Sequence, residues 1–234
     1  MFRSFYRFTS SIAAAALLLI SFSVASSANA QRPRRVGHET NVTRQLRIDH
    51  QIHETYTHRW EVGGGGGYLR FRSGEFTQKN SEITFWMNTT YFLNPKLGIT
   101  GEVRGAYGNA KVPGGNPFAN FVGNPQISEY PLLAGPTYRF REKEKYAVSA
   151  FALGGVAIGK FDGASHGISA AQLGFWPSTS ARPAFSLGAN LDLNLYPNLA
   201  FRIAPSYLGT TFGGKLENNM GFEMGLVYRF GRQK

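Results

Sequence analysis

Near the C-terminus of the chain, the side chains of one segment alternate strictly in polarity. In residues 221–230, apolar and aromatic residues occupy every second position: Phe222, Met224, Leu226, Tyr228 and Phe230. Successive side chains of a β-strand point to opposite faces, so this period of two predicts a strand with one apolar face. Any fold proposed for the chain has to bury that face or place it against lipid.

The same alternation recurs from about Trp60 onward, in stretches separated by turn residues. It is clear in 185–195 and 199–207, similar in 97–107 and 132–140, and weaker in 85–93 and 146–158. The run Gly63–Gly67 obscures the phase of the first stretch and indicates a bulge or a close approach of neighbouring backbone. The pattern predicts eight strands: 60–72, 82–93, 97–108, 130–140, 146–159, 184–195, 199–211 and 219–230.

The predicted connections alternate in length. Three are tight turns, at 94–96, 141–145 and 196–198, and the others are longer segments rich in Gly, Asn, Ser and Pro, at 73–81, 109–129, 161–183 and 212–218. Short periplasmic turns and long external loops are typical of up-and-down barrels in outer membranes. The predicted fold class is therefore all-β: an eight-stranded antiparallel up-and-down transmembrane β-barrel with both termini in the periplasm.

Alternation alone does not orient the barrel, because a soluble lipocalin-like periplasmic barrel also alternates but keeps its apolar face inside. The polar faces here are mostly Gly, Ala, Ser, Thr and Asn, which suit the cramped lumen of a small barrel. All eight lysines fall in predicted turns, loops or ends: Lys79, Lys96, Lys111, Lys143, Lys145, Lys160, Lys215 and Lys234. This distribution favours an apolar face turned toward lipid.

Aromatic residues cluster toward both ends of the predicted strands, which indicates two interfacial girdles. Those at the short-turn ends are Tyr91, Tyr138, Phe140, Tyr146, Tyr228 and Phe230. Those toward the long-loop ends are Phe85, Tyr107, Phe185, Tyr207 and Phe222.

The N-terminus predicts export. Arg3 and Arg7 precede an apolar run at 12–20, and the small residues Ala28 and Ala30 frame a cleavage site, so residues 1–30 are predicted to be a secretory signal peptide. Beyond it no run of 18 apolar residues occurs, so entry into a membrane requires a closed barrel. The formal net charge of +11 suits anionic lipid or other envelope polyanions, whereas nucleic acid is not expected as the partner of an exported protein.

Together with the signal segment and the eight strands, the closing segment resembles outer-membrane barrels related to the transmembrane domain of outer membrane protein A and to the opacity-type proteins. Its polar Glu223, its Gly225 and its aromatic Tyr228 and Phe230 look like the assembly signal of that family, although residues 231–234 follow as a tail. The resemblance implies a protein of the cell outer membrane, assembled by the barrel assembly machinery, and no defined activity.

The inward phase of the predicted strands carries seven charged residues: Glu102, Arg104, Arg139, Asp192, Arg202, Glu223 and Arg229. Eight strands enclose an interior just filled by side chains, and an isolated buried charge costs several kcal/mol. We therefore expect these charges to pair and to close the lumen, with a narrow ion path as the alternative.

Residues 31–59 form a basic, histidine-containing segment ahead of the barrel, predicted at 60–230. The arginines suit contact with anionic lipid or envelope polymers, or an ordinary linker: Arg32, Arg34, Arg35, Arg44 and Arg47. Histidines at 38, 50, 53 and 58, near Glu39 and Glu54, are candidate ligands of a metal site. Their spacing is loose and no cysteine accompanies them, which favours solvated side chains. No metal or cofactor is expected.

A catalytic function is not expected. His166 lies near Ser165 and Ser169 in a long loop, and this combination resembles the lipid-facing His and Ser of small barrels that hydrolyse lipid A acyl chains. No strand-borne third group is positioned to complete a triad. The sequence thus predicts a structural or surface-interaction barrel, displaying loops 109–129 and 161–183. A porin-like small-solute channel is the main alternative, ahead of a lipid-modifying enzyme. Loop aromatics either contact partners or pack within the loops: Phe118, Phe121, Phe175 and Trp176.

Overall fold

The computed structural model describes residues 40–178 and 181–232. Its contacts divide the chain into two units, Met1–Gln45 and Leu46–Lys234, and the barrel belongs to the second. The predicted signal peptide and His38 lie outside the described residues. Within the described residues, no helix has the length and apolarity to cross a membrane.

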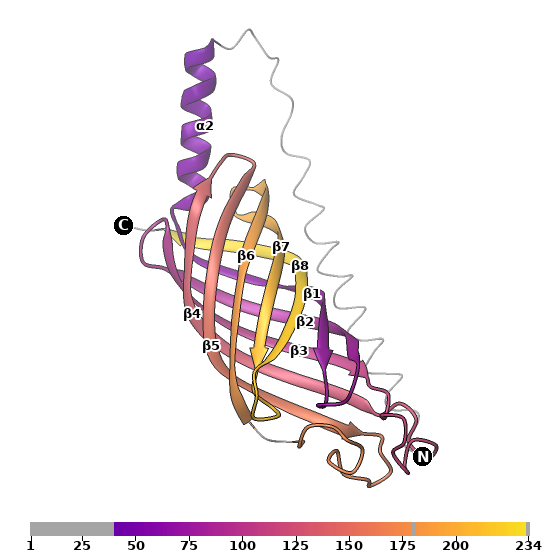
Figure 1. The fold of residues 1–234 in the computed structure, drawn as a ribbon. Helices are drawn as coiled ribbons and strands as arrows, with labels where there is room; N and C mark the ends of the chain where they lie inside the picture. Colours follow the sequence, from indigo (N-terminus) through magenta and orange to yellow (C-terminus); the bar gives the residue numbers. More distant parts are fainter. Residues whose placement is uncertain (1–39, 179–180, 233–234) are drawn as a thin grey trace, which may run out of the picture. The chain divides into compact units, whose positions relative to one another are not determined.

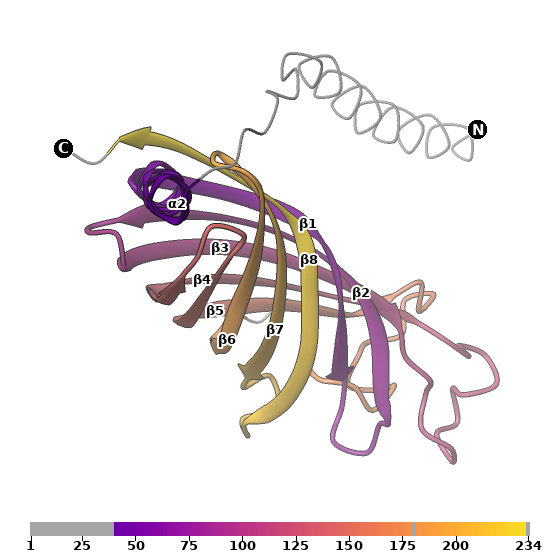
Figure 2. The ribbon, with the colours of Figure 1, turned by 90° about the horizontal axis from the view of Figure 1, so that it is seen from above.

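Eight antiparallel strands close into a barrel in sequence order (Figures 1 and 2). Pairing of the first strand with the last completes the ring, with Trp60 opposite Phe230 and Gly65 opposite Gly225. The predicted fold class is confirmed. The strands are β1 (His58–Arg72), β2 (Lys79–Phe92), β3 (Leu97–Asn109), β4 (Gln126–Glu142), β5 (Tyr146–Gly163), β6 (Ala181–Tyr196), β7 (Leu199–Thr210) and β8 (Glu217–Arg232).

Several strands are longer than the sequence pattern predicts, mainly at the loop end. The ladder between β4 and β5 continues to the pair Gln126 and Gly163, beyond the segment in which polarity alternates. Backbone pairing does not depend on side-chain polarity, so strands extend into polar sequence. Lys79 is consequently the first residue of β2 and Lys160 lies within β5, not in a loop. The two longest loops shrink to 110–125 and 164–180.

The glycine run of β1 brings neighbouring chain close without interrupting the pairing. Neither ladder of β1 shifts register. A Cβ atom at Gly63 would lie 2.9 Å from the buried ring of Trp86, and one at Gly65 would collide with the Met224 carbonyl. Trp86 Nε1 donates to that carbonyl oxygen at 3.4 Å. Of the two possibilities that the sequence left open, close approach is the one observed; the register shifts lie at 126/128, 139/141 and 194/196.

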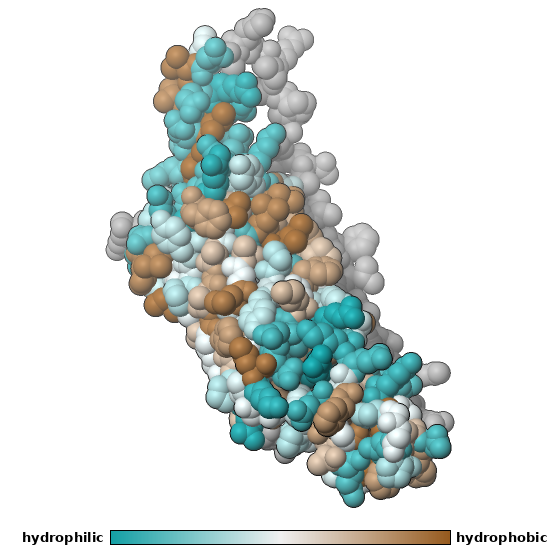
Figure 3. Space-filling model, in the orientation of Figure 1, coloured by the Kyte–Doolittle hydropathy of each residue, from teal (hydrophilic) through white to brown (hydrophobic). Residues whose placement is uncertain are grey.

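The outward face of the barrel is apolar. Brown, hydrophobic side chains are seen along the strand wall in Figure 3, and the exposed ones on β4 to β8 include Leu132, Val156, Leu187, Leu191, Met224 and Leu226. Trp60 packs against Tyr91 and Phe230 near the short turns, with ring centroids 4.8 and 6.5 Å apart. Toward the loops, outward ring pairs form between Tyr68 and Phe222, Phe85 and Tyr107, and Phe185 and Tyr207. Such an exterior suits lipid with two aromatic belts.

An apolar cluster fills the barrel at its loop end. Phe71, Phe161 and Phe212 pack with centroid separations of 5.1 to 6.1 Å. Loops 110–125 and 164–180 contribute buried side chains to the same cluster: Val112, Val122, Ala170, Leu173 and Phe175. Three other aromatic residues lie in these loops. Phe118 and Trp176 pack partly against this cluster, whereas Phe121 is 68% exposed. The loops are therefore anchored onto the end of the barrel.

Helix α2 (Asn41–Tyr56) precedes the barrel, in a segment where the sequence analysis predicted no element. Thr40 Oγ1 accepts the backbone N–H of Thr43 at 3.3 Å, which is the bond of an N-terminal cap. The helix ends at Tyr56, whose side chain is buried against the barrel.

Candidate functional site: the charged lumen

Among the residues that the structure describes, ten side chains of Asp, Glu and Arg are buried inside the barrel. The seven that the sequence placed on the inward phase are all among them. Three further acids, Glu61, Glu82 and Glu129, were missed. Glu61 precedes the glycine run that obscured the phase of β1, Glu82 stands at the predicted start of its strand, and Glu129 falls in the predicted loop 109–129.

Glu61 is the centre of the cluster nearest the short turns. Its Oε1 accepts from Arg139 Nη2 at 2.5 Å and from Arg229 Nε at 2.8 Å, and its Oε2 accepts from Arg202 Nη2 at 3.0 Å. Asp192 binds Arg202 with both oxygens, at 2.6 and 2.8 Å, and Arg229 at 3.3 Å. Two carboxylates from β1 and β6 thus hold three arginines from β4, β7 and β8. Charge-assisted bonds of this bidentate kind are strong and fix geometry.

Aromatic rings enclose the arginines at the short-turn end. The Arg139 guanidinium lies between Phe92 and Tyr56, with its carbon 4.2 and 5.0 Å from the ring centroids. Its Nη1 donates to the Pro95 carbonyl oxygen in the β2–β3 turn at 2.9 Å. Arg229 also lies over the Tyr56 ring, at 5.5 Å. Cations stacked on rings away from water gain about 2 kcal/mol or more, so Tyr56 stabilises the cluster that it covers.

The Tyr56 hydroxyl is fixed by the chain around it. It donates to the Lys143 carbonyl oxygen at 2.7 Å and accepts from Asn194 Nδ2 at 2.7 Å. Asn194 Oδ1 in turn accepts from Arg229 Nη1 at 2.8 Å. Burial raises the pKa of Tyr56, so the phenol keeps its proton and remains a donor at neutral pH. The end of α2 is in this way bonded into the charge network.

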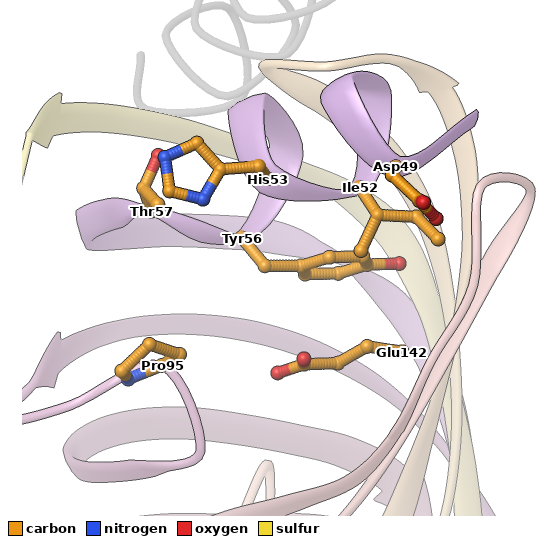
Figure 4. Close-up of a pocket in the computed structure, with 7 residues that line it drawn as sticks. All are labelled: Asp49, Ile52, His53, Tyr56, Thr57, Pro95 and Glu142. Carbon is orange, nitrogen blue, oxygen red and sulfur yellow. The ribbon is translucent and has the colours of Figure 1, made fainter. Parts of the chain in front are cut away.

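A small pocket of about 340 Å³ lies beside Tyr56. Figure 4 shows the Tyr56 ring with His53 on one side and Pro95 and Glu142 on the other; Asp49, Ile52 and Thr57 complete the lining. Among the described residues, no three His, Asp or Glu side chains are grouped so as to hold a metal ion. His58 Nδ1 lies 3.1 Å from the Thr55 carbonyl oxygen, in the local turn after the helix.

Arg104 occupies the middle of the lumen. Arg104 belongs to β3. Its Nε lies 2.7 Å from Glu102 Oε1 and 2.7 Å from Glu223 Oε1, and its Nη1 donates to Ser206 Oγ at 3.0 Å. Its Nη2 is 3.4 Å from Ser186 Oγ. One side chain of β3 therefore reaches β6, β7 and β8 across the interior. These buried ion pairs fit a closed lumen.

Glu82 and Glu129 form the outermost charged layer, beneath the apolar cluster. A Cβ atom at Gly108 of β3 would lie 2.8 Å from Glu82 Cγ, and Glu129 pairs with Ala106 of the same strand, so the two acids flank β3 on the inside. The small residues between them leave room for both carboxyl groups. Among the described residues, neither carboxylate has a hydrogen-bond partner.

The four residues of the family-like closing signal have different environments. Glu223 faces the lumen, and a Cβ atom at Gly225 would collide with the backbone of β1 at Gly64. Tyr228 and Phe230 face outward and stack with centroids 6.0 Å apart. The strand continues to Arg232.

The loop residues considered for catalysis are not joined to one another. Ser165 Oγ donates to the Ile168 carbonyl oxygen at 2.6 Å, and Ser169 Oγ bonds Gln172 Oε1 at 2.9 Å. The His166 ring contacts Phe121, with centroids 5.7 Å apart. Both hydroxyls thus hold the loop turns in place.

No family model matches the chain, and no curated protein matches it. Its structure is similar to solved structures of outer-membrane proteins. Neisserial surface protein A matches with a TM-score of 0.51 and 13% identity, over 73% of this chain and 97% of that one. OprG of Pseudomonas aeruginosa matches with a TM-score of 0.50 and 12% identity, over 75% and 97%. This chain has the fold of the small eight-stranded outer-membrane β-barrels.

Proposed function

We propose that the chain is an outer-membrane barrel with a structural and surface-interaction role, and that its lumen does not conduct. The supporting observation is the filling of the interior along its length. The Glu61 cluster lies near the short turns, Arg104 crosses the middle, and Phe71 and Phe161 pack at the loop end. A solute path would have to break ion pairs and separate a packed apolar cluster, each of which costs several kcal/mol.

The loops supply the surface for interaction. Loops 110–125 and 164–180 are held by buried side chains in the apolar cluster, so their exposed residues are presented on a fixed base. Phe121 of loop 110–125 is 68% exposed, and Phe76 of the neighbouring loop 73–78 is 84% exposed. Exposed aromatics on anchored loops are common features of binding surfaces. With Ser165 and Ser169 committed to loop bonds, the proposed role is not catalytic.

Lipid, the assembly machinery and envelope anions are the proposed partners. The apolar wall contacts lipid. The segment that the assembly machinery would read is β8, with Glu223, Gly225, Tyr228 and Phe230. The arginine-rich segment 31–59 carries charge suited to anionic lipid or envelope polymers at the periplasmic side. Residues 1–30 serve as the secretory signal in this proposal.

Cysteine labelling tests the display of the loops, because the chain contains no cysteine of its own. Gly114→Cys places a thiol in loop 110–125, where a Cβ atom meets nothing within 4 Å. Lys145→Cys is the matched probe, exposed in the short turn after β4. On intact cells, a polymer-linked maleimide too large to cross the outer membrane is expected to label only Gly114→Cys. Labelling of the turn probe alone would reverse the orientation, and labelling of neither before lysis would exclude surface display.

A further inference from the structure

A polar pocket lies among the loops at the loop end of the barrel. Its volume is about 780 Å³, within the range of about 300–1,000 Å³ typical of ligand sites. It is formed where loop 73–78 and the first residues of β2 meet loop 110–125, and its lining includes Phe76, Lys79, Asn80, Asn109 and Lys111. These loops lie at the end of the barrel opposite Tyr56 and the short turns.

The charge of this pocket has one sign. Lys79 and Lys111 line it, and no Asp or Glu is among its lining residues. The neighbouring acid of loop 73–78, Glu75, is paired with Lys215 at 3.1 Å. Lys79 Nζ donates to the Asn218 carbonyl oxygen at 2.6 Å, and this neutral acceptor leaves the charge of the ammonium group uncancelled. The pocket therefore favours an anionic ligand.

The remaining lining suits a ligand rich in hydroxyl groups. Side-chain amides and hydroxyls come from Gln78, Asn80, Ser81, Asn109 and Asn124, and each can donate or accept. Phe76 adds an aromatic face that is 84% exposed. Amides pair with hydroxyls, and an aromatic face covers the C–H face of a pyranose ring, whereas a simple inorganic anion would use neither.

The walls of the pocket are formed before any ligand binds. Thr77 Oγ1 donates to the Gly74 carbonyl oxygen at 2.8 Å, and Asn80 Nδ2 donates to Ser73 Oγ at 3.2 Å. On the other wall, the Ala110 N–H donates to the Pro125 carbonyl oxygen at 3.1 Å, and the Val112 side chain is buried in the apolar cluster. A preformed site loses less entropy when a ligand binds.

We propose that this pocket binds an acidic saccharide, with the carboxylate or phosphate of the sugar between Lys79 and Lys111 and a pyranose ring against Phe76. This inference rests on the proposed surface-interaction role and gives it a ligand class. The saccharide can belong to the envelope of the cell itself or to an outside surface, because both present acidic sugars to an external loop.

Binding of oligogalacturonate fragments to the refolded protein in phospholipid nanodiscs tests the pocket, with dextran fragments of equal length as the neutral probe. We expect measurable binding of the acidic probe and at least tenfold weaker binding of the neutral one. Lys79→Gln/Lys111→Gln is expected to weaken acidic-probe binding about tenfold, as two partly exposed charge pairs imply, and added salt should do the same. Phe76→Ala is expected to weaken binding of both probes by a similar factor.

Lys143→Gln/Lys145→Gln is the matched control, because it removes equal charge from the short-turn end. Equal loss of binding in this control, or no loss in the pocket variants, would contradict binding of the acidic saccharide in this pocket. Competition by lipopolysaccharide added to the nanodiscs would assign the saccharide to the envelope of the cell, and lack of competition to an outside surface. Cells displaying the pocket variants are then compared with cells displaying the unmodified protein. Equal capture of the acidic probe would contradict binding in this pocket but would leave the proposed surface-interaction role intact. Failure of the loop-labelling test would remove the surface role itself.

Discussion

Replacing Glu61 with Gln is expected to lower the free energy of unfolding by about 3–5 kcal/mol, the cost of breaking a buried ion pair by removing one partner. The substitution preserves size and removes only the charge that Arg139, Arg202 and Arg229 share. Asp192 would then be the sole strong anion for two of those arginines. Arg139 is buried and its guanidinium lies over the rings of Phe92 and Tyr56, so exposing it to water would cost this stacking.

Urea titration of the refolded protein in lipid measures this effect, and Glu75→Gln is its control. The Glu75–Lys215 pair has a similar separation, 3.1 Å, but its side chains are 54% and 78% exposed. An exposed pair contributes about 0–1 kcal/mol, so the control should be nearly neutral. Equal, small effects for both variants would mean that water reaches Glu61 freely and that the lumen is open at this level.

Arginine on the lipid face is expected to destabilise the barrel by about 2–4 kcal/mol at the bilayer midplane and much less near the interfaces. Leu191 and Met224 are the positions to change. Both are exposed near the middle of their strands, β6 and β8, and both pair with Ile203 of the strand between them, so they face the same side of the wall. Leu191→Arg and Met224→Arg should therefore give similar losses.

Two substitutions control for the added side chain. Phe76→Arg puts arginine in an exposed loop and should leave stability nearly unchanged. Asn190→Arg points into the lumen, where Asn190 is 5% exposed, so it should act by crowding. The readout is the same refolding titration. If both lipid-face variants were neutral, the outward direction of the apolar face would be wrong.

Alternation was sufficient to predict the barrel because each strand repeats the same rule. The strand ending in Tyr228 and Phe230 already separates an apolar face from a face with Glu223 and Arg229. The rule is weaker where side chains are missing or polarity changes. Across Gly63–Gly67 no side chain reports the phase, and Glu61 consequently escaped notice although it is the centre of the charge cluster.

The pairing of the lumen charges could not be predicted from inward phase alone. Glu61 on β1 contacts Arg229 on the neighbouring β8, but it also contacts Arg139 on β4, across the interior. Arginine is long enough to pass over nearer strands. Which acid meets which arginine therefore depends on the closure of the ring and on filling by side chains such as Phe92.

The contribution of α2 was hidden for a different reason. The segment Asn41–Tyr56 is polar over most of its length and has no glycine or proline, so apolar periodicity gives little signal there. Thr40 as an N-terminal cap was the one local indication of a helix start. That Tyr56 would cover Arg139 depends on contacts with residues far along the chain, at Lys143 and Asn194.

Single-channel conductance of the purified, refolded protein in a planar bilayer tests the closed lumen most directly. With Glu61, Arg104 and the apolar cluster filling successive levels, the unmodified barrel is expected to show no stable conductance steps. Glu61→Gln, which loosens one level only, is expected to leave the record close to the baseline, because Arg104 and the cluster remain. Frequent, large and stable steps from the unmodified protein would contradict the closed lumen and identify the barrel as a channel for small solutes.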